Sequence, residues 1–163
     1  MHGASATRME DARPAVTEPR LRRFLSYLEE KRGDRPFAAR GDLDPLDFPY
    51  LLGEVVLLDV LYLPLRFRYR LVGAGLAGWR GYDLTGKFVH DHPDPAYRAQ
   101  MLARYREVVE TRRITGGAEH LELEGKRRAY QTIRAPLSDN GATVSVIIAA
   151  VVMDRAAASA RRA

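Results

Sequence analysis

The sequence contains no cysteine and no apolar run long enough to cross a membrane. Without thiols the chain cannot form disulfides, thiolate zinc sites, iron–sulfur clusters or a cysteine nucleophile. A membrane-spanning helix needs ~20 consecutive apolar residues, whereas the longest apolar run, Val144 to Met153, is interrupted by Ser145. The first residues also lack the apolar centre of a signal peptide. We therefore expect a cytoplasmic protein with no membrane association.

The composition indicates one globular domain. A chain of 163 residues, 46% hydrophobic and 29% charged, suffices for one core, whereas two cores would each be marginal. The net charge of +5 comes from arginines scattered near both ends, and they are not interleaved with the aromatic residues that stack on bases. We expect a solvated basic surface and no nucleic-acid partner.

The chain divides into three parts by composition. Residues 1–17 are small, polar and charged and predict a flexible leader. Residues 18–154 predict a single domain that includes an N-terminal helix and a connector, and residues 155–163 form a basic tail of alanine and arginine.

An amphipathic helix opens the domain. Its apolar stripe recurs at i, i+3, i+4 and i+7, and consists of Leu21, Phe24, Leu25 and Leu28. Thr17 can cap its start and Gly33 can end it. The stripe must pack either on the domain's own sheet or on the same helix of a second copy, and the second alternative predicts a homodimer through Leu21–Leu28.

A proline-rich connector follows from Arg35 to Gly53. Asp44 and Pro45 are placed to open a short helix as cap and first residue. We expect the connector to pack its apolar side chains Leu46, Phe48 and Leu51.

Two strand patterns come next. The run Glu54 to Tyr62 is almost wholly apolar, which is typical of a strand covered on both faces. The run Arg66 to Val72 alternates, which predicts one buried side, and only the tight turn at Leu63–Pro64 separates the two strands. The residues on that buried side are Phe67, Tyr69 and Leu71.

A longer helix and three further strands complete the domain. Asp94 as cap and Pro95 at the first position begin a helix that we expect to end at Gly116 and Gly117. The strand patterns, separated by turn signals, run from Ala118 to Leu123, from Arg127 to Leu137 and from Ala142 to Met153. The order predicts an α+β fold: a five-stranded antiparallel sheet, short helices on one face and the added N-terminal amphipathic helix.

Three segments of this chain have a recognisable sequence: the run from Asp42 to Asp47, the strand from Phe67 to Gly73 with the sequence FRYRLVG, and the turn from Gly81 to Lys87 with the sequence GYDLTGK. In these segments the chain resembles the family of short, mostly stand-alone bacterial PAS domains. The resemblance covers about Arg20 to Asp154. It implies a PAS-like sensory domain that binds a ligand or docks a partner between helices and sheet, and it supplies no shared cofactor.

Two glycine motifs match nucleotide-binding patterns without the required context. Gly73, Gly75 and Gly78 have the spacing of a dinucleotide fingerprint, but their strand belongs to a hairpin and not to a parallel crossover unit. Gly81 with Gly86–Lys87 imitates a phosphate loop, but Phe88 stands where Ser or Thr should bind magnesium. We interpret both as turns.

One cluster has side chains that could ligate a metal. His90, His92 and Asp94, with Asp91 between them, could hold zinc, but a loop with Asp94 as helix cap explains the same residues. We expect no metal and keep these three residues as an alternative.

No cofactor and no catalytic residue is expected. The helix from Tyr97 to Arg113 has no histidine where haem-binding PAS relatives carry their axial ligand, and flavin–cysteine photochemistry needs a cysteine. No serine with a nearby histidine and acid points to acyl transfer, and no paired carboxylates on one element point to glycoside hydrolysis.

We therefore expect a sensory domain that binds a small apolar or amphipathic molecule and relays to a separate effector protein. The candidate pocket residues offer aromatic walls with a few polar groups and are Tyr69, Trp79, Phe88, Met101, Tyr105, His120 and Tyr130. A ligand-free module for dimerisation or protein interaction remains the alternative, and a metal-binding protein or an enzyme using His90 and His92 is a further one.

Overall fold

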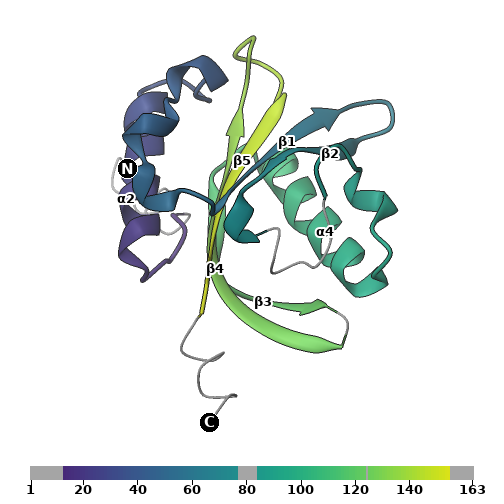
Figure 1. The fold of residues 1–163 in the computed structure, drawn as a ribbon. Coiled ribbons are helices and arrows are strands. Elements are labelled where there is room, and N and C mark those ends of the chain that lie inside the picture. Colours follow the sequence, from purple (N-terminus) through teal and green to yellow (C-terminus); the bar gives the residue numbers. More distant parts are fainter. Residues whose placement is uncertain (1–12, 77–83, 124, 155–163) are drawn as a thin grey trace, which may run out of the picture.

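The computed structural model describes residues 13–76, 84–123 and 125–154. They contain one five-stranded antiparallel sheet in the order β2–β1–β5–β4–β3 (Figure 1). Its strands are β1 (Val55–Leu61), β2 (Arg66–Val72), β3 (Thr115–Leu123), β4 (Lys126–Leu137) and β5 (Val146–Met153). The predicted fold class is confirmed. No helix within the described ranges is long and apolar enough to span a membrane.

The sheet separates two hydrophobic cores. Helix α4 (Pro95–Thr111) covers one side, which we call the inner face, and helix α2 (Pro19–Arg32) with the connector covers the other, which we call the outer face (Figure 1). Strand β5 is buried at all positions but its last, because it lies in the middle of the sheet with both faces covered.

Helix α2 packs on the sheet of its own chain. All four residues of its predicted stripe are buried in the outer core, as are the facing residues of β4 and β5. Of the two alternatives for the apolar stripe, the chain's own sheet is the one that covers these side chains, so they are not available to pair two chains. The helix ends at Gly33 as predicted, but Glu18 and not Thr17 caps its start, by accepting from the backbone N–H groups of Arg20 and Leu21.

The connector forms three single turns, Arg40–Asp42, Pro45–Asp47 and Pro49–Leu51. The predicted cap at Asp44 is confirmed, and Phe48 and Leu51 are buried. Leu46 was expected to pack but is 84% exposed. Its turn is anchored on both sides by the Tyr27 hydroxyl, which accepts from the Asp44 N–H and donates to Asp47, and this leaves Leu46 facing solvent.

The β1–β2 hairpin forms as predicted, but its alternation is interrupted. The register shifts between Leu57 and Leu58: Leu58 pairs with Tyr69, whereas Leu57 pairs with Leu71. One extra residue in β2 therefore moves Leu71 from the inner to the outer face, because successive residues of a strand point to opposite faces. The prediction of one buried side is correct for Phe67 and Tyr69 and wrong for Leu71, which is 46% exposed.

Two element ends also differ from prediction. Asp94 and Pro95 begin α4 as expected, but the helix ends at Thr111 with Arg112 in the left-handed conformation, and Gly116 and Gly117 belong to β3. Strand β5 begins at Val146 and not at Ala142. The Asn140 side chain accepts from the N–H groups of Ala142 and Thr143, which holds this segment in a turn.

Candidate functional site

Three of the seven predicted pocket residues meet in the inner core. Met101 and Tyr105 from α4 and Tyr130 from β4 surround a void together with Arg134. The volume of this void is about 10 Å³, which is close to the minimum that one water molecule requires. At this point of the inner core the described side chains therefore leave little free space.

The other predicted residues lie apart from this void. Tyr69 is fully buried and its hydroxyl lies 2.6 Å from that of Tyr97. Phe88 is half-buried beside His90, and His120 is exposed on β3. Trp79 lies outside the described residues, as do Gly78 and Gly81 of the two glycine motifs.

A buried ion pair, which the sequence interpretation missed, lies next to the void. The Arg134 guanidinium donates to both carboxylate oxygens of Glu119 at 2.7 and 2.8 Å, and the Tyr130 hydroxyl donates to the same carboxylate at 2.7 Å. The half-exposed Arg104 lies 3.6 Å from it. The alternation of strand β3 could have revealed this pair, because Glu119 shares its side with the buried residues Leu121 and Leu123.

The charges of this network stabilise each other. Burial by itself would raise the pKa of the Glu119 carboxyl, but the hydrogen bonds and charge of Arg134 outweigh it and hold that pKa below its ordinary value. Burial raises the pKa of the Tyr130 hydroxyl, and the neighbouring Glu119 carboxylate adds to the rise. At neutral pH the site thus holds an ionised Glu119, a charged Arg134 and a neutral Tyr130.

The histidine cluster is arranged around the start of α4. His92 is buried, its ring stacks on Tyr97 at 4.0 Å between centroids, and its Nδ1 accepts from the Asp94 N–H at 3.0 Å. The Asp94 carboxylate accepts from the backbone of the first helical turn. Across the described ranges, no group of three His, Asp or Glu side chains is placed to hold a metal ion.

The outer face contains a much larger space, which we call the outer groove. Its volume is about 550 Å³, and it runs between the connector and the strands β1, β2 and β5. Arg40 is its one charged lining residue among the described residues. The others are apolar or glycine: Leu43, Pro45, Phe48, Pro49, Leu51, Leu52, Gly53, Val55, Leu57, Leu71, Val72, Gly73, Ala74, Leu137 and Ile148.

Two local features create the outer groove. The register shift places Leu71 beside Leu57 on its floor. At one end the backbones of Gly53 and Gly73 approach so closely that a Cβ atom on Gly73 would lie 2.3 Å from the Gly53 carbonyl oxygen. Gly73 and Gly75, two positions of the dinucleotide-like motif, therefore serve a close packing of backbones.

The connector wall of the groove is attached to helix α2. The ring of Phe48, which lines the groove, lies 5.2 Å from that of Phe24 and 5.5 Å from that of Tyr27. The Tyr27 hydroxyl donates to Asp47 at 2.8 Å. A displacement of the connector would therefore reach α2 through direct side-chain contacts.

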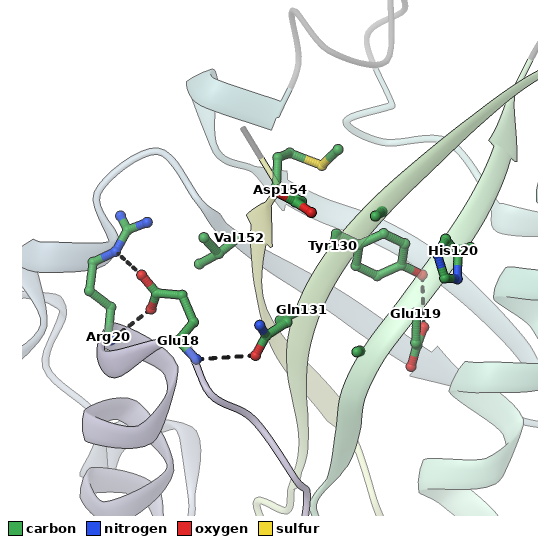
Figure 2. A pocket seen from close by; sticks show the side chains of 11 residues that line it. Glu18, Arg20, Glu119, His120, Tyr130, Gln131, Val152 and Asp154 are labelled. Carbon is green, nitrogen blue, oxygen red and sulfur yellow. Dashed lines mark hydrogen bonds and ion pairs between the residues drawn. The ribbon is translucent and has the colours of Figure 1, made fainter. Parts of the chain in front are cut away.

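Another hollow, of about 680 Å³, lies where the chain approaches α2 and leaves β5 (Figure 2). His120 and Tyr130 line it, and several of its other polar groups bind one another. Figure 2 shows the Gln131 side chain, which accepts from the Glu18 N–H at 3.1 Å, and the Glu18 carboxylate, which accepts from Arg20 at 2.9 Å. These three groups are thus engaged within the chain.

The family model described as "PAS domain" matches residues 16–151. The chain belongs to the PAS domain family. The predicted resemblance is confirmed, and with it a sensory role in signal transduction. No curated protein matches the chain.

Solved structures of light-oxygen-voltage (LOV) domains resemble this PAS domain in fold. A LOV domain studied with a flavin analogue is 16% identical, with 72% of this chain and 90% of that chain covered and a TM-score of 0.49. The Rhodobacter sphaeroides LOV protein is 14% identical, with 68% of each chain covered and a TM-score of 0.48. The dark structure of the Aureochrome1 LOV domain is 14% identical, with 69% and 83% covered and a TM-score of 0.49.

Proposed function

We propose that this PAS domain is a non-catalytic cytoplasmic sensor that binds a small apolar or amphipathic molecule in the outer groove and relays to a partner protein. The difference in volume between the two faces carries the proposal: about 550 Å³ in the outer groove against about 10 Å³ in the inner void. Small-molecule sites are mostly apolar and measure roughly 300–1,000 Å³. The inner site predicted from the sequence stays a prediction, since one of its residues, Trp79, lies outside the described residues.

The relay would pass from the connector to α2. A molecule bound between the connector and the β1–β2 hairpin presses on Phe48, which contacts Phe24 and Tyr27 of the helix. The helix presents a different side to solvent, and a partner docked there would sense its movement. The exposed residues of that side are Arg22, Arg23, Ser26 and Glu30.

The neutral fluorescent dye N-phenyl-1-naphthylamine tests the groove. Leu57 lies half-buried on the groove floor, so Leu57→Trp should fill the space and weaken dye binding by at least about tenfold, which is ~1.4 kcal/mol of binding free energy. Arg106→Trp is the matched control, because it adds the same indole to an exposed position of α4 on the opposite face. Dye titration measures affinity, and circular dichroism checks that each variant is folded.

Equal dye binding by the folded Leu57→Trp variant and the wild type would contradict the proposal. The ligand-free interaction module is the second candidate, because Leu46, Leu52 and Leu71 beside the groove expose 84%, 88% and 46% of their surface. A wild-type dimer that binds no dye and is lost in Leu57→Trp, measured by sedimentation, would favour this module.

A further inference from the structure

The outer groove carries one charge that the described chain leaves uncompensated. The side chain of Arg40 is exposed and makes no hydrogen bond or ion pair with any residue that the structure describes. The carboxylates nearby in sequence are engaged elsewhere. Asp42 accepts from Arg35 and from the Ala39 N–H, Asp44 accepts from the Leu46 N–H, and Asp47 accepts from the Tyr27 hydroxyl.

The remaining surface of the groove is apolar. The floor is made by Leu57 of β1, Leu71 of β2 and Ile148 of β5, and the connector supplies the facing wall. A guanidinium beside such a surface binds an anionic group through charge-assisted hydrogen bonds. A cationic headgroup would be repelled, and a neutral one would leave Arg40 without a partner.

We propose that the outer groove binds a free, single-chain amphiphile with an anionic headgroup, such as a medium-chain carboxylate. The alkyl chain of the amphiphile lies over Leu57 and Ile148, and its headgroup pairs with Arg40. This inference rests on the proposed function and specifies the class of its ligand. An apolar groove with a single cationic side chain matches a ligand that has a single alkyl chain and a single anionic group.

Competition against the neutral dye tests this inference with the full-length protein. Decanoate, decanol and decyltrimethylammonium share a ten-carbon chain and differ in the headgroup. We expect decanoate to compete up to about fivefold more tightly than decanol, because an ion pair with an exposed guanidinium contributes at most about that factor, and the cation to compete most weakly. Octanoate should bind about 15-fold more weakly than decanoate, since each buried methylene contributes about fourfold.

Two variants assign the effect to Arg40. Arg40→Gln should make decanoate and decanol compete about equally with the dye. Arg106→Gln removes the same charge from the opposite face of the sheet, so it should keep the advantage. Both positions are exposed, and neither substitution removes a side-chain hydrogen bond or ion pair within the described chain.

The outcomes separate the inference from the proposed function. If decanoate and decanol compete equally, and Arg40→Gln changes neither, the groove binds amphiphiles but the anionic headgroup is wrong. If the wild type binds neither the dye nor any amphiphile, the proposed function itself fails. If anionic phospholipid vesicles bind in an Arg40-dependent manner while decanoate does not compete, the ligand is a lipid surface and the free amphiphile is overturned.

Discussion

Both faces of the sheet bury a hydrophobic core. They differ in the volume of the space left beside the core and in whether the charged side chains there are buried or exposed. On the inner face α4 closes over a void of about 10 Å³ and a buried ion pair, Glu119–Arg134. On the outer face the connector leaves a groove of about 550 Å³, whose one described charge, Arg40, is exposed. One sheet therefore supports a closed core on one side and an open apolar surface on the other.

The difference in free space between the two faces follows from how helix α4 and the connector pack on the sheet. Helix α4 is continuous over 17 residues and sets whole turns of side chains against the sheet. The connector consists of three single turns joined by extended residues. Its buried residues are Phe37, Ala38, Phe48 and Leu51, and Ala38 forms a single β-bridge with Leu137 of β4. A short segment with few anchors cannot fill the surface beneath it, and the groove is the result.

The largest effect on stability is expected from a substitution that breaks the Glu119–Arg134 ion pair on the inner face. Glu119→Leu should lower the free energy of unfolding by ~3–5 kcal/mol, because it leaves the buried Arg134 guanidinium without its counter-charge. Adding Arg134→Met should recover most of the loss, since apolar residues of similar volume replace a buried ion pair at little cost. Urea unfolding followed by circular dichroism measures both. A double variant as unstable as the single one would show that the charge itself is not the cause.

A smaller effect is expected at the end of the outer groove. Gly73→Ala should cost ~1–3 kcal/mol of stability, because the new Cβ would lie 2.3 Å from the Gly53 carbonyl oxygen and push the connector away from β2. Gly41→Ala in the same connector is the control. No heavy atom lies within 4 Å of the Cβ it would add, so its stability should change by less than about 0.5 kcal/mol.

Thermal unfolding of both glycine variants, with dye titration of each, checks this prediction. Gly73→Ala should also change the dye affinity, because Gly73 lines the groove. If both variants are equally stable and bind the dye equally, the contact between the Gly53 and Gly73 backbones does not shape the groove.

The smallest effect is the pH dependence of the inner face. The pKa of Glu119 is lower in the folded than in the unfolded chain, so the unfolded chain binds the proton more readily. The stability from Glu119 is then complete above the unfolded pKa, about 4.3, and is lost as the pH falls through the folded pKa.

The double variant Glu119→Leu/Arg134→Met isolates this contribution. Outer-face carboxylates such as Glu18, whose pKa is also lowered, are common to both proteins and cancel in the comparison. Urea unfolding at a series of pH values below about 5 should show a steeper loss of stability in the wild type. Parallel curves would mean that Glu119 does not titrate differently in the folded state.

Local signals in the sequence predicted most of the fold. Asp94 and Pro95 mark the start of α4 because cap chemistry is decided by the residues at the helix end itself. The helical spacing of the apolar residues in α2 predicts its buried stripe. The same spacing does not indicate whether the chain's own sheet or a second copy covers that stripe. The position of Leu71 was predicted wrongly, since the register shift depends on how β1 and β2 pair and not on the alternation within β2.

The order of the elements, the family and the absence of thiol chemistry can be predicted from neighbouring residues or from composition. The position of the remaining space depends on contacts between residues far apart in the sequence. Glu119 of β3 forms its ion pair with Arg134 of the neighbouring strand β4, and the backbone of Gly53 contacts that of Gly73 at the end of the β1–β2 hairpin. Both contacts depend on strand register. The pairing of β3 with β4 buries the Glu119–Arg134 ion pair on the inner face, and the pairing of β1 with β2 shapes the outer groove that Arg40 lines.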